Sequence, residues 1–425
     1  MPGHVVHLRC LVCGATYAPE EVDYVCPRHG REGILDVEYD YERIAATVDR
    51  GDLAGSFDRG MWRYRPLLPV EPEAPVPPLL VGDTPMVESA RMAERVGVRR
   101  LWVKDEGRQP TASLKDRASA MAVVKAGERE AAVITTASTG NAAAALSGLC
   151  ASVGYPNVIF VPAAAPPAKV AQLLSFGSTV MLVEGTYGDA FDLCLEAADA
   201  FGWYNRNTGY NPHMSEGKKT AAYEICEQLH WRAPDVVTVS VGDGCIIGGL
   251  HKGFHDLAEL GWIDRMPRLI GVQSEGSNYL TEAWERREDV LTKAPIEAHT
   301  VADSISAELP RDRLKAMRAV TGSGGAFVAV SDEAILAAVP DMARNSGVFG
   351  EPAGAAAWAG LLAAAERGLV GPGERVVVLN TGSGLKDVAS AMKAAEGAGI
   401  EATRIPPSLE AVERVMGERS PEGAT

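Results

Sequence analysis

The chain has 425 residues, of which 46% are hydrophobic and 23% charged, and its formal net charge is −15. These values are typical of a globular protein with a sizeable core, and they exclude a broad basic face for nucleic acid or an anionic membrane. No apolar run approaches the roughly 20 residues needed to span a bilayer. Residues 1–9 lack the pattern of a signal peptide, so we expect a cytoplasmic protein.

The first thirty residues contain two pairs of potential metal ligands. Cys10 and Cys13 form one pair, Cys26 and His29 form the other, and the pairs stand twelve residues apart. Three thiolates and one imidazole at this spacing suit a structural, tetrahedral zinc ion. His7 is an alternative ligand, and free thiols in a small β-hairpin are the alternative interpretation. The other cysteines are scattered and indicate no disulfide framework.

The middle of the chain changes character twice. Residues 36–66 mix charges and aromatics without a clean period, and 68–78 form a proline-rich extended connector. From 101 onward, short apolar strands alternate with amphipathic helices, which predicts an α/β fold with mainly parallel sheets covered on both faces. We expect the tail 418–425 to be disordered. The predicted strands are 101–104, 132–136, 158–162, 179–183, 236–241, 269–273 and 375–380, and the predicted helices are 116–126, 142–151, 167–176, 189–201, 215–229, 332–346 and 353–367.

Lys115 lies in the run Pro-Thr-Ala-Ser-Leu-Lys-Asp-Arg at 110–117, between a predicted strand and a predicted helix. Its small and hydroxylated neighbours favour a buried amine. Burial favours the neutral form of an amine, and a neutral amine can form a Schiff base with an aldehyde such as pyridoxal phosphate (PLP). The alternative is a surface lysine that pairs with Asp116 at a helix start.

Two further loops each follow a predicted strand and precede a helix. Ser138, Thr139, Gly140 and Asn141 supply hydroxyl and N–H groups that suit a carboxylate, unless they only cap the helix. Asn141 can also donate to a phenolate oxygen. The second loop is glycine-rich and suits a phosphate; it comprises Gly242, Asp243, Gly244, Cys245 and Ile246, and continues to 249.

The glycine-rich loop has a second interpretation, because it is close to a dinucleotide fingerprint. The strand 269–273 and Glu275 would then supply the next strand and the acidic ribose ligand of an NAD site. The glycine spacing disagrees with that fingerprint. A last loop, which begins at Thr381, follows the strand 375–380, and its hydroxyls suit a pyridine nitrogen.

All four loops stand at the carboxyl ends of predicted strands, where an open α/β sheet binds ligands. With this arrangement the chain resembles the fold type II PLP enzymes of the tryptophan-synthase-β-like superfamily, and within them the threonine synthases. The resemblance covers nearly the whole chain. It rests on residues 110–117, 138–141, 216–220, 242–249, 350–354 and 381–387, and on the cysteine knuckle with the run Leu-Asp-Val-Glu-Tyr-Asp-Tyr at 35–41.

The resemblance implies two interleaved, doubly wound domains in 81–425. We expect the smaller subdomain at roughly 120–230 and the larger one in 81–119 and 231–425. A zinc-ribbon-like knuckle at 1–35 and an arm with its connector at 36–80 precede them. A homodimer is also expected.

The resemblance further implies a role for each loop. Lys115 would hold PLP as a Schiff base and carry protons, Asn141 would contact the ring hydroxyl, and Thr381 would meet the ring nitrogen. The loop 242–246 would bind the PLP phosphate. Ser138, Thr139 and Gly140 would hold the substrate carboxylate. Threonine synthases convert O-phosphohomoserine and water to threonine and phosphate, so the expected partner is a small phosphorylated amino acid.

One stretch departs from the family pattern Asn-Ser-x-Asn-Pro-x-Arg-x-Glu-Gly. Met214 stands at the arginine position, and methionine makes no bidentate contact with a phosphate. The candidates to replace the arginine are Lys169, Arg206, His213 and Lys218. Met214 therefore favours, as an alternative, a PLP enzyme of β-replacement or elimination on a serine-type substrate, like cysteate synthase or threonine dehydratase. An NAD-dependent oxidoreductase and a zinc-knuckle binding protein are the remaining alternatives.

Overall fold

The computed structural model describes residues 4–165 and 167–418, and the expected disordered tail lies almost wholly outside them. Its largest sheet has six strands in the order β12-β11-β10-β13-β5-β4, all parallel except β4. The parallel strands are apolar and buried, as expected for a sheet covered on both faces. The strands are β4 (Met86–Glu88), β5 (Arg100–Asp105), β10 (Val236–Ser240), β11 (Arg268–Ser274), β12 (Ala326–Val330) and β13 (Arg375–Asn380).

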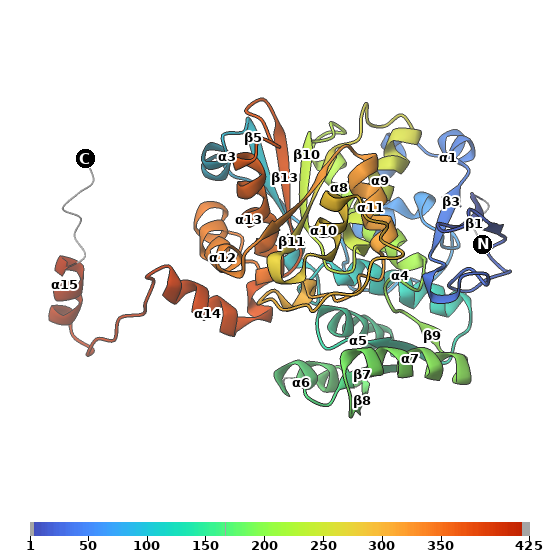
Figure 1. The fold of residues 1–425 in the computed structure, drawn as a ribbon, viewed down its shortest axis with the longest axis horizontal. Helices are drawn as coiled ribbons and strands as arrows, with labels where there is room; N and C mark the ends of the chain where they lie inside the picture. Colours follow the sequence, from blue (N-terminus) through green and yellow to red (C-terminus); the bar gives the residue numbers. More distant parts are fainter. Residues whose placement is uncertain (1–3, 166, 419–425) are drawn as a thin grey trace.

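Helices cover both faces of this sheet (Figure 1). One face packs against α3 (Ala90–Val96), α12 (Asp332–Ser346) and α13 (Pro352–Glu366). The other face packs against α9 (Cys245–Glu259) and α11 (Arg313–Gly322), and α8 (His213–Gln228) lies on α9. Close backbone approach explains the glycines of α9, since a Cβ at Gly253 would lie 2.4 Å from the carbonyl oxygen of Lys219.

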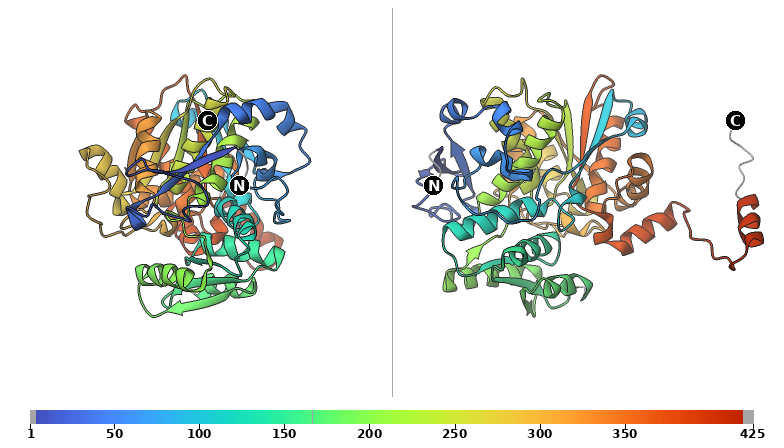
Figure 2. Two further views of the ribbon diagram at one scale, coloured as in Figure 1. Left: turned by 90° about the vertical axis from the view of Figure 1, so that its right-hand side faces the viewer. Right: turned by 180° about the vertical axis from the view of Figure 1, so that it is seen from behind.

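The second sheet is smaller and wholly parallel, in the order β8-β7-β6-β9. With its helices it forms the lower layer in Figures 1 and 2. Helix α7 covers one face, while α4 and α5 pack on the other. Its elements are α4 (Lys115–Glu128), β6 (Ile134–Ala137), α5 (Asn141–Val153), β7 (Asn157–Pro162), α6 (Pro167–Ser175), β8 (Thr179–Val183), α7 (Tyr187–Phe201) and β9 (Tyr204–Asn205).

An antiparallel sheet of three short strands forms the N-terminus, in the order β2-β1-β3. Its third strand extends to Tyr39, so this sheet crosses the expected boundary at residue 35. Two short helices and a 3-10 helix then occupy much of 36–66. These elements are β1 (Val5–Cys10), β2 (Thr16–Tyr17), η1 (Gly30–Glu32), β3 (Leu35–Tyr39), α1 (Tyr41–Thr47), α2 (Arg50–Ala54) and η2 (Gly60–Leu67).

The C-terminus leaves the body of the protein. Figure 1 shows α14 (Val388–Gly397) and α15 (Leu409–Glu418) extending away from both sheets. The remaining short elements lie in loops of the large sheet: η3 (Glu106–Arg108), η4 (Glu275–Ser277), α10 (Tyr279–Arg286), η5 (Asp303–Ile305) and η6 (Gly384–Lys386). No described helix has both the length and the apolar character needed to cross a membrane.

Candidate active site

A cavity of about 670 Å³ lies where the two parallel sheets face each other. The carboxyl ends of β6, β10 and β13 reach it through Thr136, Ser240 and Thr381. This is the edge at which open α/β sheets bind ligands. The residues to which the resemblance assigns a role toward the cofactor or the substrate carboxylate all line this cavity: Lys115, Ser138, Thr139, Gly140, Asn141, Gly242, Asp243, Gly244, Cys245, Ile246 and Thr381.

The loop before Lys115 is held against the segment that follows β13. Leu114 N donates to Thr381 O (2.9 Å), and Ser383 N donates to Ala112 O (3.0 Å). Ala112 adopts a φ of 66°, an uncommon value for a residue with a side chain, and such strain clusters at functional sites. These contacts bring Lys115 and Thr381 to one wall. Lys115 is half-buried and lines the cavity.

The two residues after Lys115 fix the start of α4. Asp116 is buried and accepts hydrogen bonds from the Thr111 hydroxyl and from Thr111 N (2.7 Å), not from Lys115. Burial raises the pKa of Asp116 to about 6, although the hydrogen bonds from Thr111 oppose the shift. The alternative of a surface lysine paired with Asp116 is therefore wrong.

Arg117 lies in a buried ion network behind the cavity wall. It donates to Glu106 (2.7 Å) and to both oxygens of Glu224 (2.8 Å each). Lys104 Nζ lies 2.7 Å from the same Glu224 carboxylate. Buried charges are tolerated when they are paired and hydrogen-bonded. The network therefore anchors α4, and with it Lys115, to α8 and to the large sheet.

The loop 138–141 opens α5 beside the cavity. Gly140 is the N-cap residue, and its N–H donates to Ser138 Oγ (3.2 Å). The first N–H groups of a helix have no partner within it, so this end suits an anion such as a carboxylate. Asn141 is buried and donates through Nδ2 to Glu351 Oε1 (2.7 Å).

Glu351 is a cavity residue that the sequence reasoning missed. Glu351 directly precedes α13, within the run 350–354 that carries part of the resemblance. Its side chain nevertheless lines the cavity beside Asn141 and Thr381. Burial raises the pKa of Glu351 to about 7, against the effect of the Asn141 hydrogen bond. Such a carboxyl can give or accept a proton near neutral pH. The sequence signal was the run Gly-Glu-Pro-Ala-Gly at 350–354, but no role was assigned to its carboxylate.

The glycine-rich loop fits the phosphate of PLP. Gly244 has a φ of 94°, and a Cβ there would lie 2.7 Å from that of Ala316, so only glycine lets the loop turn. Helix α9 begins directly after it at Cys245. The N–H groups of this first turn line the cavity, where they can bind an anion, and the amine of Lys115 lies in the same cavity. The donor set therefore suits a phosphorylated aldehyde.

The dinucleotide interpretation of this loop fails on geometry. Strand β11 does follow β10 and pairs with it. However, Glu275 is exposed and lines a different depression beside α12, together with Ser331 and Glu366. It is not a lining residue of the cavity at the glycine-rich loop, so no acidic ribose ligand accompanies the loop.

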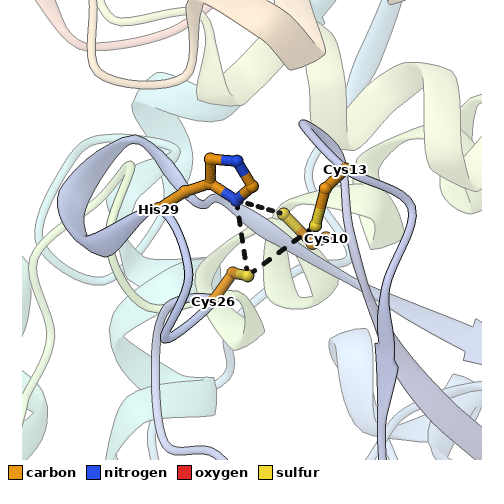
Figure 3. A group of neighbouring side chains, drawn as sticks. All are labelled: Cys10, Cys13, Cys26 and His29. Carbon is orange, nitrogen blue, oxygen red and sulfur yellow. Dashed lines mark hydrogen bonds between the residues drawn. The ribbon is translucent and has the colours of Figure 1, made fainter.

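Three cysteines and a histidine gather at the N-terminal sheet (Figure 3). Their four ligand atoms lie within 4.8 Å of one another. Cys13 Sγ is 3.9 Å from Cys26 Sγ, close to the edge of about 3.8 Å in a tetrahedron with 2.3 Å zinc–sulfur bonds. His7 lies outside the group and pairs with Glu38 at 2.5 Å, so it is not a substitute ligand. The tetrad is Cys10, Cys13, Cys26 and His29.

The structure separates the four candidates to replace the family arginine. Met214 is 1% exposed and packs in the apolar core of the smaller sheet. Lys169 pairs with Asp303 at the surface (2.5 Å), and neither ring nitrogen of His213 has a partner. Arg206 lines the cavity, and Lys218 contacts Thr208 of its lining (3.3 Å). Of these four candidates, only Arg206 lines the cavity directly, and only Lys218 reaches the lining through Thr208.

Comparisons with known proteins agree with this geometry. A profile of the family described as pyridoxal-phosphate dependent enzyme matches residues 78–382. The threonine synthase of Methanocaldococcus jannaschii is 36% identical over 413 residues, which cover 96% of this chain and 99% of that protein. That of Methanosarcina acetivorans is 38% identical over 382 residues, 90% of this chain and 92% of that protein. A solved structure of processed threonine deaminase isoform 2 from Solanum lycopersicum is similar with a TM-score of 0.63 and 23% identity, covering 75% of this chain and 88% of that one, and shows the fold alone.

Proposed function

The chain belongs to the family of pyridoxal-phosphate dependent enzymes and is similar to threonine synthases along nearly its whole length, and on this premise we propose that it is a threonine-synthase-type lyase. The reaction converts O-phosphohomoserine and water to threonine and phosphate. One observation carries the proposal: the amine of Lys115, an anion-binding helix start and the glycine-rich loop line a single cavity.

Each wall of the cavity supports one part of the cofactor site. Lys115 would bind PLP covalently, the loop of Gly242, Asp243, Gly244, Cys245 and Ile246 would hold its phosphate, and Asn141 and Thr381 would meet its ring. PLP, when bound, supplies an aldehyde for the substrate amine and an electron sink for carbanions at the substrate. The buried network behind Lys115 supports a fixed orientation of this wall.

The chain's own groups then supply binding and proton transfer. Ser138, Thr139 and Gly140 would bind the substrate carboxylate at the start of α5, where the helix dipole favours an anion. Lys115 Nζ, once released by the substrate amine, would take the proton from the α-carbon and, after giving that proton up, would take one from the β-carbon. Glu351 lies beside the ring position and can exchange a proton near pH 7.

The experiment that tests the function compares four substrates in parallel. Purified enzyme is incubated with O-phosphohomoserine, O-phosphoserine, O-acetylserine and threonine, and phosphate, 2-oxo acids and amino-acid products are assayed. We expect threonine and phosphate in equal amounts from O-phosphohomoserine. Pyruvate or 2-oxobutyrate, or a replacement product from a serine derivative, would instead support the alternative that Met214 favours.

We propose a structural zinc ion in the cysteine tetrad, supported by the near-tetrahedral spacing of its ligand atoms. Purified protein should carry about one zinc per chain by metal analysis, and Cys10→Ser should lose it, because a site with three ligands binds far more weakly. The matched control is His7→Ala, which removes a nearby imidazole outside the tetrad and should retain the zinc. Wild-type protein without zinc, together with normal folding of Cys10→Ser, would contradict the site.

We propose a homodimer in which the C-terminal arm of one copy, α14 and α15, packs on a second copy. The arm points away from its own body (Figure 2), yet it carries large apolar side chains that are 58–69% exposed: Met392, Leu409 and Met416. Exposed apolar groups at this density mark interaction sites. At its root, Phe349 and Leu385 offer further exposed apolar surface on the body.

Light scattering of the full chain tests the arm. We expect a dimer for the wild type and a monomer for the double variant Leu409→Glu with Met416→Glu, because two charges would enter an apolar interface. Glu413→Gln, an exposed change on the same helix, should remain dimeric. A monomeric wild type would rule the arrangement out, as would a dimer that survives the double variant.

We also propose a cytoplasmic location. None of the seven cysteines, all of which the structure describes, forms a disulfide, which supports a reducing compartment.

A further inference from the structure

Two buried cations in this protein have no acidic partner. Among the residues that the structure describes, eight lysines and arginines are more than nine-tenths buried. Six of them form ion pairs with carboxylates, as buried charges generally must. The two exceptions, Arg206 and Lys218, stand together at the cavity wall. The six paired cations are Lys104, Arg117, Lys125, Lys219, Arg313 and Lys315.

The two cations converge on one hydroxyl group. Arg206 Nη1 donates to Thr208 Oγ1 (3.0 Å), and Lys218 Nζ donates to the same oxygen (3.3 Å). Arg206 Nε donates to Ser119 Oγ (3.1 Å), while Arg206 Nη2 is buried without any hydrogen-bond partner. Arg206 and Thr208 line the cavity. The cluster therefore has a hydrogen-bond donor that no protein group satisfies. A ligand in the cavity can accept from it.

The unpaired positive charges of Arg206 and Lys218 favour binding of an anion. Burial lowers the pKa of Lys218 to about 8, and the charges of Lys115 and Arg206 contribute. Burial also lowers the pKa of Arg206 to about 10. The adjacent Lys219 shows the contrast, because its ammonium lies 2.7 Å from Glu216 and 2.8 Å from Asp256. A phosphate dianion beside Arg206 and Lys218 would supply the missing negative charge.

We infer that Arg206, Lys218 and the Thr208 hydroxyl bind the phosphate group of the substrate. This inference rests on the proposed function for the identity of the phosphate ester. PLP carries the same chemical group, but the N–H groups at the start of α9 already suit its phosphate. A cation pair in addition to that cradle fits a second phosphate in the same cavity.

The site also accounts for Met214. Lys218 stands four residues after Met214, one turn further along α8. Since Met214 packs into the apolar core, the positive charge at this wall comes from the next turn of the helix and from Arg206 on the preceding segment. The phosphate contact is thus kept with a different pair of residues.

The experiment uses the holoenzyme in phosphate-free buffer and the variants Lys218→Met and Arg206→Met. Binding of inorganic phosphate and of O-phosphohomoserine is measured by calorimetry and by the change in the visible PLP spectrum, and PLP content is measured separately. We expect both phosphate ligands to bind about ten- to hundredfold more weakly to each variant, the usual loss for a charged hydrogen-bonding partner. Homoserine, which lacks the phosphate, should bind all forms equally.

Three controls separate this role from a structural one. Lys218→Arg keeps the charge and should restore most phosphate binding. Lys169→Gln removes a paired cation near the same cavity and should change nothing. Lys218→Met should raise the melting temperature in the absence of phosphate, because it removes an unneutralised buried charge. Phosphate should raise the melting temperature of the wild type but not of this variant.

The outcomes distinguish the inference from the proposed function. Loss of PLP from the variants with unchanged binding of phosphate ligands would assign the cations to the cofactor and overturn the inference. Variants that bind phosphate like the wild type, or a wild type that binds none, would also overturn it. If the enzyme makes no threonine but loses phosphate binding in both variants, the anion site stands and the proposed reaction fails.

Discussion

Replacement of Lys115 by alanine should abolish turnover, with kcat reduced by at least about 10⁴-fold. The Lys115 amine lies in the same cavity as the glycine-rich loop, and it would both bind the cofactor covalently and transfer protons. A single proton-transferring group contributes up to about 10⁴-fold, and the covalent role adds to this loss. Steady-state assay of threonine and phosphate measures the effect, and the visible absorption band of the lysine-bound cofactor should be lost.

The matched control is Lys393→Ala, which removes an exposed amine on α14 and should leave both turnover and the absorption band unchanged. Lys115→Ala protein can still retain PLP through noncovalent contacts with the loop 242–246. Full activity in Lys115→Ala would contradict the catalytic role assigned to this lysine, whatever the cofactor content.

Glu224→Gln should destabilise the fold by about 3–5 kcal/mol, the usual cost of breaking a buried ion network by removing one partner. Glu224 is wholly buried and neutralises both Arg117 and Lys104. Burial would raise the pKa of this carboxyl, but the two cations outweigh it and hold the pKa well below the ordinary range. Its contribution is therefore present at neutral pH and lost as the pH falls through the acid range. Urea denaturation at pH 7 measures the change.

Glu227→Gln provides the comparison, since Glu227 stands one turn further along α8. Its carboxylate is 21% exposed, pairs with Arg63 (3.2 Å) and accepts a hydrogen bond from the Tyr64 hydroxyl. The glutamine oxygen can still accept from Tyr64, so loss of the charge should cost about 1 kcal/mol or less. Equal destabilisation by the two variants would contradict the idea that the buried network anchors α4. A decrease in kcat for Glu224→Gln at a temperature where it stays folded would tie the network to the position of Lys115.

The regular part of the fold could be predicted from the sequence. Each of the seven predicted strands and seven predicted helices is present, with ends within two residues. Apolar strands between amphipathic helices have a strong period, and the α/β fold type II expectation is confirmed. The strands that were not predicted are β1, β2 and β3 of the N-terminal sheet and, in the larger part of the chain, β4, β9 and β12. Strands β4 and β9 have only three and two residues, and β12 (Ala326–Val330) is a short apolar run, which by itself suits a strand or a buried helical segment equally.

The strand topology explains why Lys115 and Thr381 could be predicted to lie close together. Strands β5 and β13 are parallel neighbours, so the loops after them, which carry Lys115 and Thr381, reach the same edge. The family match also confirms PLP as the cofactor. The roles of individual cavity residues stay predictions.

The remaining features depend on side-chain contacts that a linear pattern does not contain. Glu351 directly precedes α13 in the sequence, and only the folded structure shows that its side chain contacts Asn141. Arg206 and Lys218 lie together because both donate to Thr208, which stands in the segment between β9 and α8. Met214 occupies the position of the family's phosphate-binding arginine, yet its side chain lies in the apolar core. In each case tertiary packing decides which polar group reaches the cavity.

Borohydride reduction of the purified holoenzyme followed by peptide mapping tests the central claim most directly. Reduction converts the bond between PLP and its lysine into a stable secondary amine, which marks that lysine in the mass spectrum. We predict the pyridoxyl group on Lys115 in nearly every chain. A label on Lys218 or on another lysine, or no label in protein that carries PLP, would contradict the account.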